Sequence, residues 1–589
     1  MAEFTTRPVI MGTFGVVAAG HYLAAAIGMR VLESGGNAVD AGVAAGFALN
    51  LVKPQSNGIG GEAPILIHRA GEGSGPKVAA INGQGSAPRR ATIEWFRGEG
   101  IDVIPGDGFL PATVPAAYGS WVTALMRYGR LGLKETLGPV VELAGSGFAV
   151  YPILRDAIAR NADKYREQWP STAEIYLDGG RVPPVGWLLR QPVWARTFQG
   201  ALDVEARERH RGREAALRAA LDYFYRGPVA EKAAAFAGTT EVLDASGRPH
   251  RGLIEAGDFA VFRTTVEEPV AFNYRGIDVH KCGPWSQGPV FLQQLALLEG
   301  FDTSGARSGL AAMGHNSARY IHTVVEAAKL AFADRERYYG DPAFVEVPLD
   351  RLLSKEYAAR RRELIDPALA SSDLRPGDAP ATRPRVVVGD PRVYTGDTTH
   401  LDVIDAEGNM FAATPSGGWI PSSPVVPDLG FPLGTRGQQF YLDPSHPDAL
   451  APGKRPRTTL TPSLAMRDGQ PWMVFGTPGG DMQDQWSLQF FLNVVDFGMN
   501  LQAAIDAPSF HTSHFPSSFY PHGAHPRRVV VEGRVPPSVR EELAGMGHDV
   551  VVGGDWAHGQ VTAVRLDRGS GLIEGAASPR GMTAYAIGR

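Results

Sequence analysis

The sequence of 589 residues contains a single cysteine, Cys282, which excludes an intrachain disulfide and a metal site built from several cysteines. It has no apolar run of about 18 residues that could cross a bilayer, and its first residues lack the pattern of a signal peptide. No charge of one sign dominates, because 57 Lys and Arg nearly balance 62 Asp and Glu. These absences predict a cytoplasmic protein that binds neither nucleic acid nor a membrane surface.

Motifs for cofactors are also missing. The glycine cluster at residues 57–62, Asn-Gly-Ile-Gly-Gly-Glu, has the spacing of neither a dinucleotide-binding nor a phosphate-binding loop, and it precedes a predicted strand instead of a helix. The 15 histidines show no HExxH or paired spacing that would indicate a metal. We therefore expect no nucleotide, no metal and no other cofactor.

The sequence does contain a short polar segment directly before a predicted strand, Gly-Asp-Thr-Thr-His at residues 396–400. Residues 401–414 read as two short strands joined by a turn at residues 405–409, which predicts a β-hairpin. A threonine hydroxyl needs a neighbouring base to act as a nucleophile. Cleavage of the peptide bond before Thr398 would supply one, because an α-amine has a pKa of about 7.7–8.0. Taken alone, the motif is more typical of a polar turn, so the rest of the chain decides.

Helices and strands alternate along the remaining chain. Residues 21–33 and 38–51 predict two helices separated by Ser-Gly-Gly-Asn, and the second is apolar on nearly every side, as buried helices are. Residues 317–339 predict a long helix whose charges are expected on a solvated or partly paired face. Residues 366–397 contain five prolines among charged and small residues, which predicts an exposed, poorly packed linker. Strands are expected at residues 64–68, 401–404, 410–414, 472–475 and 563–566. Strands paired beneath helical layers favour an α/β sandwich over a doubly wound sheet.

The chain resembles the γ-glutamyltransferase (glutathione hydrolase) family of N-terminal-nucleophile hydrolases in six stretches, which occur in the family's order. It is identified as a divergent member. The stretches are residues 34–67, 85–88, 284–302, 326–358, 396–414 and 453–481. The resemblance implies a four-layer αββα sandwich made as an inactive precursor, which cuts itself between Asp397 and Thr398. It implies a large subunit, residues 1–397, that ends in the linker, and a small subunit, residues 398–589, that begins with the threonine nucleophile.

The resemblance also implies the catalytic residues. Thr398 is the nucleophile, and Ser416 stands where the family has a second threonine that hydrogen-bonds the nucleophile's hydroxyl. Gly479 and Gly480 match the Pro-Gly-Gly sequence whose backbone N–H groups form the oxyanion hole, where the backbone must approach the substrate closely. His400 is expected to be a structural neighbour, because the α-amine already serves as the base.

Recognition of the acyl group departs from the family. Thr458 and Thr459 stand in place of a serine pair that holds the substrate carboxylate. Gln84 occupies the place of the arginine that grips the α-carboxylate of a γ-glutamyl group, and a neutral amide cannot make that bidentate ion pair. The acid that binds the α-ammonium falls near Gln438 and Gln439, which are also neutral.

Three other arginines are candidates for a new carboxylate clamp: Arg436, Arg89 and Arg457. Each alone is more typical of a surface or structural arginine. Two further departures are Gly418, where the family has an asparagine, and a shorter lid segment at about residues 441–452.

Two functions stay open. The first is a self-processing amidohydrolase or acyltransferase that cleaves a γ-glutamyl, glutathione-like amide through a Thr398 acyl-enzyme and passes the acyl group to water or an amine. The second keeps this chemistry for another small acyl group, oxamate-like or the glutaryl side chain of a cephalosporin, and Gln84 favours it. A third hypothesis, a binding protein that never cleaves, predicts an intact chain of 63.0 kDa. The expected partners are a small-molecule amide and the two subunits themselves.

Overall fold

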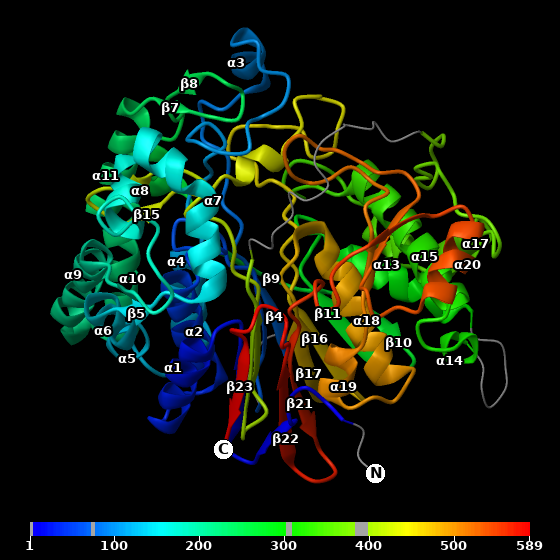
Figure 1. Ribbon diagram of the computed structural model, residues 1–589. Coiled ribbons are helices and arrows are strands. Elements are labelled where there is room, and N and C mark those ends of the chain that lie inside the picture. Colours follow the sequence, from blue (N-terminus) through cyan, green and yellow to red (C-terminus); the bar gives the residue numbers. More distant parts are fainter. Residues whose placement is uncertain (1–3, 72–76, 302–308, 383–397) are drawn as a thin grey trace.

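The computed structural model describes residues 4–71, 77–301, 309–382 and 398–589. Figure 1 shows four layers: helices on the left, two β-sheets in the middle and helices on the right. Each central sheet contains seven strands. None of the helices within the described residues is both long and apolar enough to pass through a bilayer. The arrangement confirms the predicted α/β class and the four-layer αββα sandwich.

The predicted hairpin forms the centre of one sheet. Its two strands, β12 (Leu401–Asp405) and β13 (Met410–Ala413), are antiparallel and wholly buried. On its other side β12 pairs with β2 (Gly15–Ala19), so that strands from before and after residue 398 lie next to each other. The antiparallel order is β23-β2-β12-β13-β3-β4-β9. The other strands of this sheet are β23 (Tyr585–Gly588), β3 (Ile65–His68), β4 (Val78–Asn82) and β9 (Thr265–Glu267).

The second sheet mixes the same two parts of the chain and has the order β1-β22-β21-β17-β16-β11-β10. An apolar cluster between the sheets joins side chains from both, including Val16 and Ile404 of the first sheet and Val474 and Val564 of the second. The strands of the second sheet are β1 (Ile10–Gly12), β22 (Leu572–Ala577), β21 (Thr562–Asp567), β17 (Gln470–Gly476), β16 (Ser463–Arg467), β11 (Ile277–Lys281) and β10 (Val270–Tyr274).

Two apolar clusters attach the helical layers to the outer faces of the sheets. On one side, α1 (Tyr22–Glu33) and α2 (Ala38–Val52) pack against the hairpin sheet. Asn37 caps the start of α2, since its side chain accepts the N–H groups of Val39 and Asp40, and every residue of the helix is buried. On the other side the layer contains α13 (Gly288–Glu299), α15 (Ala318–Tyr338), α18 (Gln483–Val495) and α19 (Leu501–Asp506).

The remaining elements extend these layers. On the α1/α2 side and above it they are α3 (Ile93–Gly98), α4 (Ala117–Tyr128), α5 (Leu133–Thr136), α6 (Gly138–Ser146), β5 (Phe148–Ala149), α7 (Pro152–Gln168), α8 (Pro170–Tyr176), β6 (Leu188–Leu189), α9 (Pro192–Glu208), α10 (Arg213–Tyr225), α11 (Pro228–Thr239), β7 (Val242–Leu243), β8 (Pro249–His250), α12 (Ala256–Val261), β14 (Val425–Val426) and β15 (Phe431–Pro432). The others are α14 (Leu310–Met313), α16 (Leu349–Leu352), α17 (Lys355–Arg362), β18 (Phe510–Thr512), β19 (Arg528–Val531), α20 (Pro537–Gly545) and β20 (Asp549–Val552).

The charges of α15 were expected on a solvated or partly paired face, and four of them are paired but not solvated. Glu326, Lys329, Asp334 and Arg335 are all buried, and each forms an ion pair. Their partners come from segments that are distant in sequence and cover the helix. These four charges are therefore part of the interior of the protein, whereas Arg319 and Arg337 of the same helix are exposed.

The first part of the predicted linker, residues 366–382, lies within the described chain, where many of its residues are exposed but several points of it are held to the rest of the protein. Glu326 of α15 accepts hydrogen bonds from the Ser371 N–H at 3.2 Å and from Arg375 Nη2 at 3.0 Å. The Ala370 N–H donates to the Met546 carbonyl at 2.8 Å, so the other side of this segment is held by the C-terminal part of the chain. Proline-rich composition did not reveal these contacts, because they are made by backbone groups and by one arginine.

Candidate active site

Thr398 lies directly before β12 and faces Ser416. Their hydroxyl oxygens are 3.0 Å apart, and both residues are buried. The backbone sets this pair, because Thr398 bridges Ser416 on one side and Ser416 exchanges two hydrogen bonds with Glu62 on the other, at 2.8 and 3.0 Å. The structure thus brings together the two predicted hydroxyls. Asp397, the predicted residue before the cut, lies outside the described residues.

Glu62 and Arg436 form a buried ion pair beside these hydroxyls. Arg436 Nε lies 3.1 Å from Glu62 Oε2, and Arg436 Nη2 donates a hydrogen bond to Ser416 Oγ. Both side chains of the pair are fully buried. The predictions did not include Glu62. Its only signal in the sequence is an acid at the end of the glycine cluster, where the chain has no room for a solvated carboxylate.

The glycines near Ser416 are required by close backbone packing. Gly417 and Gly418 have positive φ angles of 69° and 58°. A Cβ added to Gly418 would lie 2.6 Å from the Gly61 nitrogen, and one added to Gly417 would lie 2.0 Å from a Glu62 carboxylate oxygen. The side chain expected by comparison with the family at position 418 has no room in this backbone.

The predicted oxyanion-hole glycines follow β17. Gly479 and Gly480 both have positive φ angles, 134° and 53°, and a Cβ on Gly479 would lie 2.3 Å from the Trp486 ring. A Cβ on Gly476, the last residue of β17, would lie 2.4 Å from the His400 ring. The loop that contains the two glycines therefore starts beside the strand that carries Thr398. Gly479 is needed for steric reasons, and the positive φ of Gly480 also favours glycine.

His400 has the structural position that was expected. Its Nδ1 lies 2.8 Å from Thr414 Oγ1, and its Nε2 lies 2.9 Å from Asp402 Oδ1. Asp402 also accepts a hydrogen bond from Thr562 of the other sheet at 2.7 Å. Burial raises the pKa of Asp402 above its ordinary value. This chain of contacts ties β12 to the second sheet.

Four of the five predicted recognition residues carry buried polar atoms without a hydrogen-bond partner among the described residues. These atoms are Gln84 Oε1, Thr459 Oγ1, Arg436 Nη1 and both side-chain polar atoms of Gln439. The fifth residue, Thr458, accepts the Leu460 N–H at 3.3 Å. Buried polar groups are nearly always paired, and each exception calls for an explanation such as a ligand or water. Gln438 differs from its neighbour, because its side chain is hydrogen-bonded to Gly106, Thr435 and Tyr520.

Arg89 and Arg457 have other partners and are not the clamp. The Arg89 side chain is 60% exposed and pairs with Asp258 at 3.2 Å. Arg457 is buried, where it donates to Glu336 at 2.9 Å and to the Arg335 carbonyl at 3.1 Å. Among the three candidate arginines, only Arg436 touches the pair of hydroxyls.

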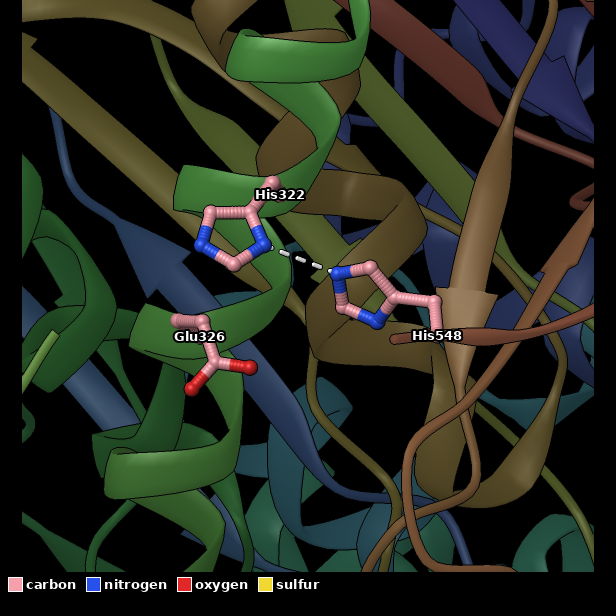
Figure 2. A group of neighbouring side chains, drawn as sticks. All are labelled: His322, Glu326 and His548. Atoms are coloured by element: carbon pink, nitrogen blue, oxygen red, sulfur yellow. Dashed lines mark hydrogen bonds between the residues drawn. The ribbon is translucent and has the colours of Figure 1, made fainter. Parts of the chain in front are cut away.

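A group of possible metal ligands lies away from these residues. His322 and Glu326 of α15 face His548, and the two imidazoles are 2.8 Å apart between Nδ1 and Nε2 (Figure 2). Lys329 Nζ, however, lies 2.6 Å from Glu326 Oε1, and the same carboxylate pairs with Arg375. Two cations already neutralise the only acid of the group, so a metal ion here would meet net repulsion. We regard this group as a contact that joins α15 to the C-terminal part of the chain.

Comparison with known proteins agrees with the geometry. The sequence profile described as gamma-glutamyltranspeptidase matches residues 24–588. The glutathione hydrolase-like YwrD proenzyme of Bacillus subtilis (strain 168) is 32% identical over 580 residues, which cover 97% of this chain and 98% of the relative. The solved structure of LmbA2991HD has a TM-score of 0.92 at 46% identity over all of both chains. Cephalosporin acylase from Bacillus halodurans has a TM-score of 0.83 at 30% identity, covering 100% of this chain and 98% of that one.

A four-layer sandwich with a threonine at the start of a central strand defines the class of N-terminal-nucleophile hydrolases. This chain belongs to the gamma-glutamyltranspeptidase family within that class. It is an enzyme, an amidohydrolase or acyl transferase of that family.

Proposed function

We propose that the protein activates itself by cutting the bond between Asp397 and Thr398. The Thr398 hydroxyl attacks the Asp397 carbonyl, the acyl group moves from nitrogen to oxygen, and water then hydrolyses the ester. The products are a large subunit, residues 1–397, and a small subunit, residues 398–589. The observation that carries this proposal is the buried pair of hydroxyls, 3.0 Å apart, of Thr398 and Ser416.

The same hydroxyl then acts on substrate. The freed α-amine of Thr398 takes the hydroxyl proton, the oxygen attacks the amide carbonyl, and the amine leaves with the proton. The resulting acyl-enzyme is resolved by water or by an acceptor amine. Ser416 hydrogen-bonds the nucleophile, and the N–H groups of Gly479 and Gly480 bind the developing oxyanion, a contribution that is typically worth on the order of 10²–10³ in rate.

The acyl group is small and is not an α-amino acid. The residues that contact it are Gln84, Thr458, Thr459, Arg436 and Gln439, and the unpaired polar atoms of four of them support a polar ligand. This set contains one cation, Arg436, and no acid, and the carboxylate of Glu62 beside it already accepts from Arg436 Nε. A γ-glutamyl group would bring an α-ammonium that must lose water without gaining a carboxylate, which is costly.

A γ-glutamyl amide is the second candidate. The name of the Bacillus subtilis relative, glutathione hydrolase-like, favours it, whereas the cephalosporin acylase among the structures favours another acyl group. A comparison of γ-glutamyl-p-nitroanilide with glutaryl-p-nitroanilide separates the two. We expect the glutaryl compound to match or exceed the γ-glutamyl one in kcat/KM. A γ-glutamyl preference of about a hundredfold, which is about 2.7 kcal/mol, would contradict our choice.

Substitution of Thr398 tests the central step. The purified wild type should give two bands, and the smaller should begin Thr-Thr-His-Leu. Thr398→Ala should give one band of 63.0 kDa without activity. Cleavage of that variant at the same bond would mean that a host protease makes the cut.

A cytoplasmic location and the absence of nucleic-acid or membrane partners stay predictions from composition.

A further inference from the structure

The three guanidinium nitrogens of Arg436 have different surroundings. Nε pairs with Glu62 at 3.1 Å, and Nη2 donates to Ser416 Oγ. Nη1 is buried and has no hydrogen-bond partner among the described residues. The side chain is held from two directions, so its third nitrogen is fixed in position beside the nucleophile pair.

Aromatic rings exclude water from this guanidinium. The Trp419 ring lies 5.2 Å and the Phe519 ring 5.5 Å from the guanidinium carbon, and both residues are less than 10% exposed. A charged donor in such surroundings binds an anion more strongly than it would in water. An unpaired N–H there is also costly, so the site gains when a ligand accepts from it.

We propose that Arg436 recognises a terminal carboxylate on a short acyl group whose carbonyl is attacked by Thr398. The inference rests on the proposed function and adds the substrate class, half-amides of short dicarboxylic acids. The carboxylate accepts from Nη1, while Nε and Nη2 keep their bonds to Glu62 and Ser416. Gln439, three residues further in the same short helix, has a buried amide without a hydrogen-bond partner among the described residues and is the candidate for a second donor.

The length of the acyl group follows from the separation of Arg436 and Thr398. Two hydrogen bonds in sequence join Nη2 to Ser416 and Ser416 to Thr398, so the guanidinium lies within roughly 6 Å of the nucleophile oxygen. The acyl carbon must come within about 3–3.5 Å of that oxygen. The carboxylate must approach the guanidinium to about 2.8 Å. An acyl group of two to four carbons spans the distance that is left between the attacked carbonyl carbon and the carboxylate, whereas a five-carbon group has to fold back.

The first test uses the processed wild-type enzyme and the 4-nitroanilide half-amides of oxalic, malonic, succinic and glutaric acid. Each is paired with the same compound in which a carboxamide replaces the carboxylate. We expect the carboxylate to raise kcat/KM by about 10- to 150-fold, as one charged hydrogen bond does. The ratio of kcat/KM between the carboxylate and the carboxamide compound should be larger for the oxalic, malonic and succinic half-amides than for the glutaric one. Equal rates for acid and carboxamide at every length would overturn the inference.

Variants assign the effect to Arg436. Arg436→Gln should remove the preference for the carboxylate while hydrolysis of the carboxamide compounds persists at a reduced rate. Because this change leaves Glu62 buried without its cation, the double variant Glu62→Gln/Arg436→Gln provides a neutral pair in case the single variant does not fold. Arg89→Gln, on the surface, is the matched control and should retain the wild-type ratio.

The outcomes separate this inference from the proposed function. If the chain is not cut and hydrolyses none of these amides, the proposed function is wrong. If it is cut and hydrolyses carboxamide and carboxylate compounds equally, the proposed function stands and the role of Arg436 is refuted. A carboxylate preference that survives in the folded double variant would move recognition to another residue.

Discussion

Lys53, the residue that ends α2, is an unusual feature at the scale of single residues. It is only 4% exposed, and burial lowers the pKa of its amine to about 8. It lies close to the segment just after Thr398, because a Cβ added to Gly20 would be 3.4 Å from Lys53 Nζ and 2.0 Å from Thr399 Oγ1. The protein therefore keeps a costly buried ammonium near Thr399, the residue after Thr398.

Lys53→Met should raise the stability of the protein in a pH-dependent way. The pKa is lower in the folded than in the unfolded state, so the unfolded chain binds more protons between about pH 8 and 10.5. Below pH 8 the folded wild type carries the full cost of the buried charge, roughly 3 kcal/mol at about 1.4 kcal/mol per pKa unit. The gain in free energy of unfolding should be largest there and vanish near pH 10.5.

The measurement is the difference in unfolding free energy or melting temperature between variant and wild type from pH 7 to pH 10.5. Lys232→Met, at an exposed position of α11, serves as the matched control and should change little at any pH. A Lys53→Met difference that is constant across this range would show that the ammonium is not desolvated.

At this scale, motif comparison picked out two hydroxyl residues that the structure places together, and it gave no account of the residues around them. The structure brings the predicted Thr398 and Ser416 hydroxyls to 3.0 Å. Glu62 was missed, because a single acid after glycines has no pattern of its own. The contact of Arg436 with Ser416 could not be read from the sequence either, since it depends on the fold of a turn 20 residues away.

At the scale of elements, α15 shows where local patterns stop being informative. Its bounds, like those of α1, α2 and the 401–414 hairpin, follow from nearby signals such as caps, glycines and alternation. The burial of its charges does not, because residues 366–382 and the C-terminal part of the chain cover them. Periodicity gives the faces of a helix but cannot say which polar segment will pack on a charged face.

Glu326→Ala should destabilise the protein strongly. The carboxylate neutralises Lys329 at 2.6 Å and Arg375 at 3.0 Å, and its loss leaves two cations without their shared acid. Breaking a buried pair in this way typically costs about 3–5 kcal/mol. Glu214→Ala removes an exposed pair with Arg218 and should cost less than about 1 kcal/mol.

Thermal unfolding and limited proteolysis check this prediction. Because Glu326 also accepts the Ser371 N–H, the variant should be cut faster within residues 366–382 than the wild type. Equal melting temperatures for the Glu326 and Glu214 variants would mean that the buried pair adds no stability beyond an exposed one.

At the scale of the whole molecule, the two subunits proposed here are interleaved. In the hairpin sheet, β12 comes after the proposed cut in the sequence. It pairs over five residues with β2, which comes before the cut, and on its other side with β13, which comes after it. In the second sheet, β11 pairs with β16 and β1 pairs with β22, which again crosses the cut. The apolar cluster between the sheets contains side chains from both subunits.

Separation of the subunits therefore requires the loss of both sheets. We expect the two fragments to elute together in gel filtration and to part only at denaturant concentrations where the circular dichroism of the sheets is lost. The uncut Thr398→Ala chain is the control, and its melting temperature should lie within a few degrees of that of the cut enzyme, since the cut removes one covalent bond and no strand pairing. Release of the small fragment in mild denaturant, with the secondary-structure signal intact, would contradict the interleaved sheets. The fold would thus let the proposed cut expose a new N-terminus at Thr398 without loss of the sheets that position it.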